Sequence, residues 1–95
     1  MLINKSFTAG EVVTIKLTNG DEILARYEEE TADTVTINRP LLVTISGQGL
    51  GMIPWVFLSS KETYTLQKSQ LFFVVPTKKD AADQYTQSTT GIALA

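Results

Sequence analysis

The chain has 95 residues with eight basic and ten acidic side chains, a formal net charge of −2, and neither cysteine nor histidine. This length supports one domain with a single core. The missing residue types exclude disulfides, thiolate nucleophiles, zinc–thiolate sites and the commonest general base, and the acidic balance disfavours indiscriminate binding of nucleic acid by counterion release. We therefore expect a protein that is not an enzyme and holds no cofactor or metal.

The chain shows no targeting or membrane-spanning segment. Its N-terminus lacks the apolar run of a signal peptide, and no stretch approaches the roughly 20 apolar residues that span a bilayer. We expect a cytoplasmic protein.

The first seven residues predict a single helical turn. Leu2, Ile3 and Phe7 can share one side of such a turn, and Gly10 closes the segment. Because one turn is not stable alone, we expect it to pack on the open end of the sheet. A frayed or extended segment is the alternative.

Residues 12–37 read as three β-strands joined by two turns. Apolar side chains alternate with polar ones along them, so one face is buried and the other is wet. Asn19-Gly20 predicts a two-residue hairpin turn, because both residues tolerate positive φ angles, and residues 28–33 form a polar turn. The predicted inward-facing side chains are Val13, Ile15, Leu17, Ile23, Ala25, Tyr27, Val35 and Ile37.

The middle of the chain predicts an irregular third strand and a hairpin. Asn38-Arg39-Pro40 interrupts the strand with a kink or bulge, and residues 41–45 resume an extended run. Residues 46–51 carry a G-x-G-x-G pattern, but a phosphate-binding loop needs a following helix, whereas residues 52–58 read as a strand. A flexible hairpin connection is the better interpretation.

Two further strands complete the sheet. Residues 59–62 form a polar turn, and residues 63–66 place Tyr64 and Leu66 on one side of a short strand. Residues 67–70 turn the chain again. The last strand covers residues 71–75 and ends at Pro76.

Two strands predict self-association. Residues 53–58 and 71–75 are apolar on both faces, and a small one-sheet domain covers only one face by itself. Strand addition between subunits, closed into a ring, satisfies both the apolar faces and the unpaired edges. A monomeric barrel that buries both strands is the alternative. The predicted interface residues are Ile53, Trp55, Val56, Phe57, Leu71, Phe72, Phe73 and Val74.

The composition becomes polar after Pro76, which divides the chain into a barrel domain (residues 1–76) and a C-terminal helix or flexible tail (residues 77–95). Thr77 can cap a helix that runs to about Tyr85. Beyond it we expect an unstructured end, with docking of Ile92 and Leu94 on a partner as the alternative.

This order of elements resembles the Sm/LSm fold, an all-β, strongly bent five-stranded barrel of the SH3 type. Residues 2–6 are similar to the helix that opens many Sm proteins, and residues 17–23 match the turn region of their first motif. In brevity and tail the chain is most similar to the small phage-borne Sm-like proteins of marine cyanophages. The resemblance implies rings of five to seven subunits, in which residues 53–58 pair with residues 71–75 of a neighbour, and, for a phage-encoded chain, the cytoplasm of the host cell.

The resemblance also implies an RNA pocket lined by two pore-facing turns. In the family the first turn supplies an aspartate, a flat side chain for base stacking and an asparagine; here residues 31–34 hold Asp33 and Thr34 but no stacking group. The second turn supplies Arg-Gly, or Lys-His in the bacterial host-factor branch; here only Lys68 fits, followed by Ser69. Lys68 would contact phosphate or a base acceptor, repeated around the ring.

Three classes of function follow. The first is a ring-forming, non-catalytic RNA-binding module that acts in RNA regulation. The second is a homo-oligomeric protein-interaction scaffold, because a charge of −2 on each of about six subunits gives about −12 per ring, which repels a polyanion. Residues 28–30, all glutamate, would form an acidic collar on it. The third, an enzyme, is disfavoured since the carboxylates lack calcium-loop spacing and a neighbouring nucleophile.

Overall fold

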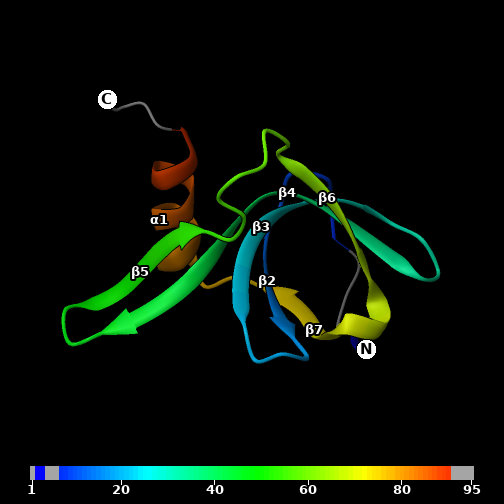
Figure 1. Cartoon of the computed structure of the whole chain (residues 1–95), viewed down its shortest axis with the longest axis horizontal. Helices are drawn as coiled ribbons and strands as arrows, with labels where there is room; N and C mark the ends of the chain where they lie inside the picture. The colour runs from blue at the N-terminus through cyan, green and yellow to red at the C-terminus, as the bar shows by residue number, and fades with distance from the viewer. Residues whose placement is uncertain (1, 4–6, 91–95) are drawn as a thin grey trace.

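The computed structural model describes residues 2–3 and 7–90, and shows a mostly β protein with one sheet and one C-terminal helix (Figure 1). The predicted all-β class is confirmed for the body of the chain. The elements in chain order are β1 (Leu2–Ile3), β2 (Val12–Leu17), β3 (Glu22–Glu30), β4 (Thr34–Ser46), β5 (Gly49–Pro54), β6 (Thr63–Gln67), the 3-10 turn η1 (Lys68–Gln70), β7 (Leu71–Pro76) and helix α1 (Lys79–Thr90).

The sheet has the strand order β1-β7-β2-β3-β4-β5, and β6 pairs with the first half of β4. All pairs are antiparallel except β1 with β7. The long strand β4 therefore serves two partners in succession: β6 along residues 34–38 and β5 along residues 41–46. Figure 1 shows the resulting curl, in which β6 and η1 return the chain to β7.

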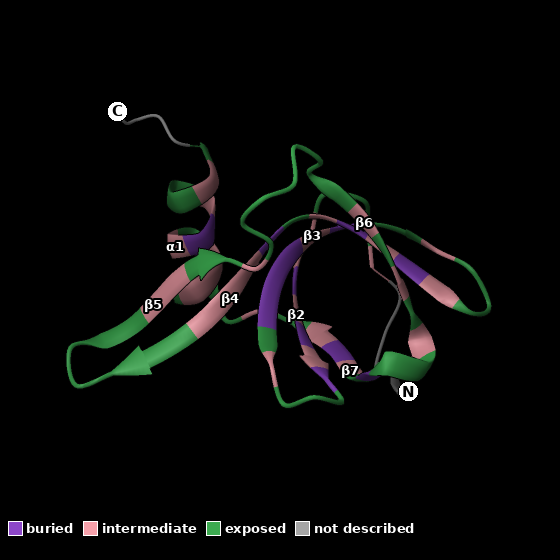
Figure 2. Ribbon diagram, in the orientation of Figure 1, coloured by how far each residue is buried: buried purple, intermediate pink, exposed green. Residues whose placement is uncertain are grey.

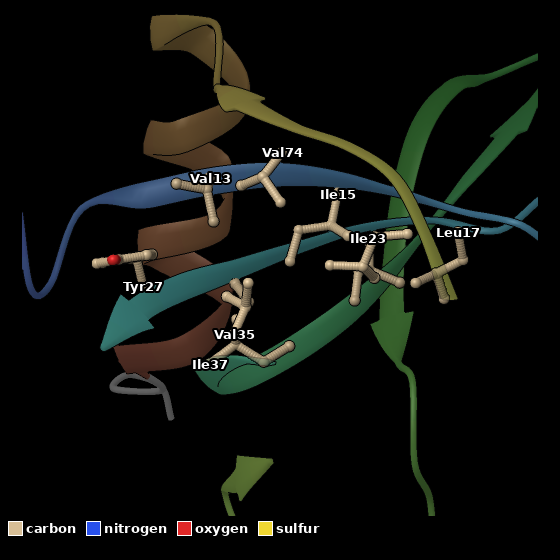
Figure 3. Packing of buried hydrophobic residues seen from close by; sticks show 10 residues of the cluster. Val13, Ile15, Leu17, Ile23, Tyr27, Val35, Ile37 and Val74 are labelled. Atoms are coloured by element: carbon tan, nitrogen blue, oxygen red, sulfur yellow. The ribbon is translucent and has the colours of Figure 1, made fainter. Parts of the chain in front are cut away.

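The core lies inside this curl and consists of alternate side chains from β2, β3 and β4 together with two side chains of β7 (Figures 2 and 3). All eight side chains predicted to face inward are buried, and the most exposed of these residues, Tyr27, has 7% of its surface exposed. Leu71 and Val74 of β7 join them. The period of two in the sequence thus places the core correctly.

The first hairpin has a three-residue loop rather than the predicted two-residue loop. The amide of Leu17 donates to the carbonyl oxygen of Asp21 (2.8 Å), and the amide of Gly20 donates to the carbonyl oxygen of Leu17 (3.0 Å). Gly20 alone in this loop has a positive φ, +99°. A turn followed by a residue in the left-handed conformation is common in three-residue hairpin loops. The loop here therefore consists of residues 18–20 and includes Thr18.

The second turn is shorter than predicted, because β3 continues to Glu30 and only residues 31–33 lie between the strands. The three glutamates at residues 28–30 therefore belong to a strand, with Glu29 paired to Thr36 and Glu30 to Val35.

The predicted irregularity at Asn38-Arg39-Pro40 is confirmed as a β-bulge. Asn38 pairs with Arg26 and Leu41 with Leu24, so three steps along β4 match two steps along β3. Arg39, the extra residue, has a φ of +53°.

The strand predicted for residues 53–58 is wrong beyond Pro54. The connection predicted over residues 46–51 is a hairpin turn as expected but shorter, because only residues 47 and 48 lie between β4 and β5. Strand β5 then pairs with β4 only as far as Leu41. Residues 55–58 lie outside any strand, because β6 occupies the next stretch of the same edge of β4, from Thr34 to Asn38.

The predicted N-terminal helical turn is also wrong where the structure describes it. Leu2 and Ile3 form a strand that pairs in parallel with Phe73 and Val74. A single helical turn is costly to nucleate, whereas the edge of β7 offers unpaired backbone groups. Residues 4–6 lie outside the described residues. Phe7 packs against the core ring of Tyr27, with centroids 5.5 Å apart.

Helix α1 starts at Lys79 and runs to Thr90, five residues past the predicted end at Tyr85. The Tyr85 side chain is buried, and its hydroxyl donates to the carbonyl oxygens of Asn38 (3.1 Å) and Arg39 (2.8 Å). The guanidinium of Arg39 donates in turn to the carbonyl oxygen of Thr89 (2.8 Å). These bonds anchor α1 to the bulge, so the expectation of an unstructured segment is wrong for residues 86–90.

Thr77, which was predicted to cap the helix, lies two residues before the first helical residue, Lys79. Its hydroxyl lies 2.8 Å from the hydroxyl of Thr14. Ile92 and Leu94 fall outside the described residues. Of the helices described, none has the length and apolar character to cross a membrane.

Candidate functional site

The structure brings together the four residues predicted for an RNA site. The amide of Lys68 donates to the carbonyl oxygen of Asp33 (2.8 Å), and Thr34 pairs with Gln67 across β4 and β6. Asp33 and Ser69 are exposed, whereas Thr34 and Lys68 are half-buried. The turn after β3 and the turn η1 therefore form one polar surface.

The charge of Lys68 is already paired within the subunit. Its Nζ donates to Oε2 of Glu30 over 2.8 Å, and only 20% of the Lys68 side chain and 27% of the Glu30 side chain are exposed. The hydroxyl of Tyr27 donates to the other oxygen of Glu30 (2.9 Å). Glu30 thus links the core tyrosine to η1.

The ionisation of this cluster follows from its contacts. The hydrogen bond from Lys68 lowers the pKa of Glu30 below its ordinary value, against the opposing effect of burial, and the Tyr27 bond acts in the same direction as Lys68. Burial raises the pKa of Tyr27 to about 12, with further contributions from the hydrogen bond and negative charge of Glu30. Glu30 therefore stays ionised and Tyr27 stays neutral around neutral pH.

The polar groups of the first turn are also used internally. The Thr31 hydroxyl lies 2.7 Å from that of Thr34, and it accepts hydrogen bonds from the amides of Asp33 (3.2 Å) and Thr34 (3.1 Å). Tyr27 is the aromatic member of the cluster, but its ring is buried and offers no face for a base to stack on.

The pairing of Lys68 with Glu30 is not predicted by the sequence. Glu30 stands in a run of three glutamates that predicts a polar turn, whereas the strand register places it beside η1. Only the combined register of β3, β4 and β6 indicates this contact, and side-chain alternation alone does not fix that register.

The predicted interface residues divide into three groups by burial. Four are exposed: Phe57 (70%), Phe72 (56%), and Ile53 and Val56 (39% each). Trp55 and Phe73 are half-buried, and Trp55 packs against the core. Leu71 and Val74 both face the core of their own subunit although they are three residues apart, because the pairing of β7 with β2 shifts register between Phe73 and Leu71.

Three further apolar side chains are exposed that the sequence analysis did not select. They are Ile45 (81%), Leu50 (41%) and Leu58 (99%). Together with Ile53, Val56 and Phe57 they form what we call the apolar surface, which comprises six exposed apolar side chains on the β4–β5 hairpin and the segment after it. Ile45 and Leu50 are paired across the hairpin, and Ile53 lies on its opposite face. Leu50 lies in the segment predicted to be a flexible connection, whereas Ile45 and Leu58 lie at the ends of predicted strands.

Within the part of the chain that the structure describes, no three acidic side chains are grouped as metal ligands. No protein-family model matches the chain, and no curated protein matches it.

Proposed function

We propose that the protein is a non-catalytic, homo-oligomeric scaffold of the Sm-like type, whose subunits join into a ring of five to seven. The supporting observation is the apolar surface, which places six large exposed apolar side chains within residues 45–58. Exposed apolar side chains gathered on one part of a small domain favour an interaction site there. The ring would be the biologically relevant unit.

The strand arrangement supports this proposal. The meander β2–β4, the loop that follows β4, and β6 and β7 separated by a short turn follow the order that the Sm resemblance implies. Strand β5 ends the sheet, so one of its edges has no partner among the described strands. On its outer edge β7 pairs only with the two residues of β1. These edges suit strand addition between subunits, and a closed ring avoids filaments.

Removing part of the apolar surface tests the contact. The double variant Phe57→Ser/Leu58→Ser should lower the number of subunits measured by native mass spectrometry, because two of the most exposed apolar side chains become polar. A matched double variant on α1, Gln87→Ser/Thr90→Ser, should leave it unchanged. Equal assembly of all three proteins would show that this surface is not the contact.

Binding of single-stranded RNA by the ring is the second candidate. It is favoured by the contact between Lys68 and Asp33, which joins the two turns that the resemblance assigns to the RNA pocket. Ring symmetry would repeat a weak contact several times. The pairing of Lys68 with Glu30 weakens this candidate relative to the scaffold, since a phosphate must compete with a carboxylate.

Titration with RNA distinguishes the RNA-binding function from the scaffold function. Short U-rich and A-rich RNAs are titrated at low and physiological salt against the wild type, Lys68→Ala and Glu30→Gln. RNA binding at this site predicts that Lys68→Ala loses affinity and that Glu30→Gln, which releases Lys68, gains it. Absence of saturable binding in all three leaves the scaffold.

A further inference from the structure

A cavity of about 270 Å³ opens between the first hairpin loop, the end of β6 with η1, and Trp55. Its apolar lining consists of Leu17, Leu66, Leu71 and Trp55. None of the four residues of the candidate RNA site lines it. The cavity therefore lies beside that site and not within it, since Gln67 and Gln70 on its rim flank Lys68 and Ser69.

Trp55 is held in place beside this cavity. The residue packs against the core, its backbone amide donates to the carbonyl oxygen of Pro40 (3.2 Å), and its indole N–H makes a long hydrogen bond to Oδ2 of Asp21 (3.4 Å). A fixed, half-buried indole offers a large flat surface at low entropic cost, which suits contact with another ring.

The rim of the cavity supplies hydrogen-bonding groups that the protein does not use itself. Gln67 and Gln70 are exposed, and neither side-chain amide has a hydrogen-bond partner among the described residues. Asn19, a third amide on the rim, is by contrast bonded to Asp21 within its turn. Each free glutamine offers one acceptor and two donor hydrogens.

The size and charge of the cavity restrict its ligand. None of its lining residues is charged, so a phosphate or carboxylate finds no counterion there. Its volume lies just below the range of about 300–1,000 Å³ typical of sites for drug-sized molecules, which fits one ring system better than a whole nucleotide. A neutral, planar group with donors and acceptors on its edge matches these walls.

We propose that this cavity binds a nucleobase, which lies against the indole of Trp55 and bonds through its edge to Gln67 and Gln70. Stacking on an aromatic side chain combined with edge hydrogen bonds is the usual way in which proteins hold unpaired bases. This proposal goes beyond the scaffold function and does not depend on ring formation.

The indole resonance of Trp55 reports on the cavity directly, because the chain has one tryptophan. In nitrogen-15-labelled protein, uridine and adenosine added to millimolar concentration should shift this resonance saturably. The shift should be the same at low and high salt, since the base is neutral. A folded protein whose indole resonance does not move with either nucleoside overturns the proposal.

Variants of the rim test the hydrogen bonds. Gln67→Ala and Gln70→Ala should each weaken nucleoside binding by about three- to tenfold, the effect of one lost hydrogen bond. Gln87→Ala, an equally exposed glutamine on α1, should have no effect. Retention of full affinity in the double variant Gln67→Ala/Gln70→Ala contradicts the proposed site.

A short single-stranded RNA distinguishes a base in a chain from a free nucleoside. It should move the same indole resonance, and Lys79→Ala should leave nucleoside affinity unchanged because Lys79 is an exposed lysine of α1 that does not line the cavity. If RNA binds while nucleosides do not, the cavity proposal fails and the binding belongs elsewhere. If nucleosides bind a protein that remains monomeric, the ring proposal fails alone.

Discussion

Nζ of Lys68 lies 2.8 Å from Oε2 of Glu30, which joins η1 to the last residue of β3. Both side chains are less than one third exposed, and Glu30 also accepts the hydroxyl of Tyr27. The lysine that family resemblance assigns to RNA therefore has a structural partner inside its own subunit. This pairing leads to the first two predictions.

Lys68→Ala should lower the free energy of unfolding by about 1 kcal/mol, because a partly buried carboxylate loses its partner. Urea unfolding at neutral pH measures this change. Lys79→Ala is the matched control: its partner Asp83 lies one helical turn away and both side chains are largely exposed, so the midpoint should not move. Equal effects of the two substitutions would refute a structural role for the Lys68 contact.

The same pair predicts a stability change in acid. Since the folded-state pKa of Glu30 lies below its ordinary value of 4.5, its contribution is complete above pH 4.5 and is lost as the pH falls through the lowered pKa. Glu30→Gln should remove this part of the pH dependence and give a flatter stability profile below pH 4.5. Identical profiles of variant and wild type would contradict it.

Tyr85 predicts a change in alkali. Burial raises its pKa to about 12, whereas the unfolded chain titrates near 10, so its contribution is complete below pH 10 and is lost as the pH rises toward 12. Tyr85→Phe should flatten this decline, and at neutral pH it should cost about 1–2 kcal/mol, because the carbonyl oxygens of Asn38 and Arg39 lose the one hydroxyl hydrogen that they share. Unfolding curves at several alkaline pH values measure both effects.

Tyr64→Phe provides the comparison at neutral pH. The Tyr64 hydroxyl donates to the carbonyl oxygen of Lys61 in an exposed loop (2.9 Å), where water can replace it. Its removal should cost clearly less than Tyr85→Phe. The reverse order would show that Tyr85 does not anchor α1.

Gly20 predicts a cost for any side chain in the first hairpin. Gly20→Ala should lower the free energy of unfolding by about 1–2 kcal/mol, because a φ of +99° is strained for alanine. Gly47→Ala is the matched control: that glycine lacks a positive φ, and a methyl group there meets nothing within 4 Å. Equal costs would contradict the loop conformation.

The core and the bulge could be predicted from the sequence because their signals are local. Alternation fixes which side chains of β2 face inward, and Pro40, which lacks an N–H, marks the break in β4. The burial of Leu24 on the opposite face could not be predicted in this way. Leu24 lies on the same face of β3 as Arg26, whose guanidinium donates to the Thr86 hydroxyl of α1.

Features that depend on distant pairing could not be predicted. The end of β5 at Pro54 is set by β6, which follows it in the chain yet takes its place on β4. The strand at Leu2 depends on the free edge of β7 in the same way. The partner of Lys68 required the combined register of three strands.

The subunit number in solution tests the proposed function most directly. Native mass spectrometry and sedimentation velocity on the unmodified chain, over a series of dilutions, should give a single closed assembly of five to seven subunits that persists at micromolar concentration. A folded protein that remains a monomer at all concentrations would contradict the proposal, because the apolar surface from Ile45 to Leu58 would then be exposed without a partner copy.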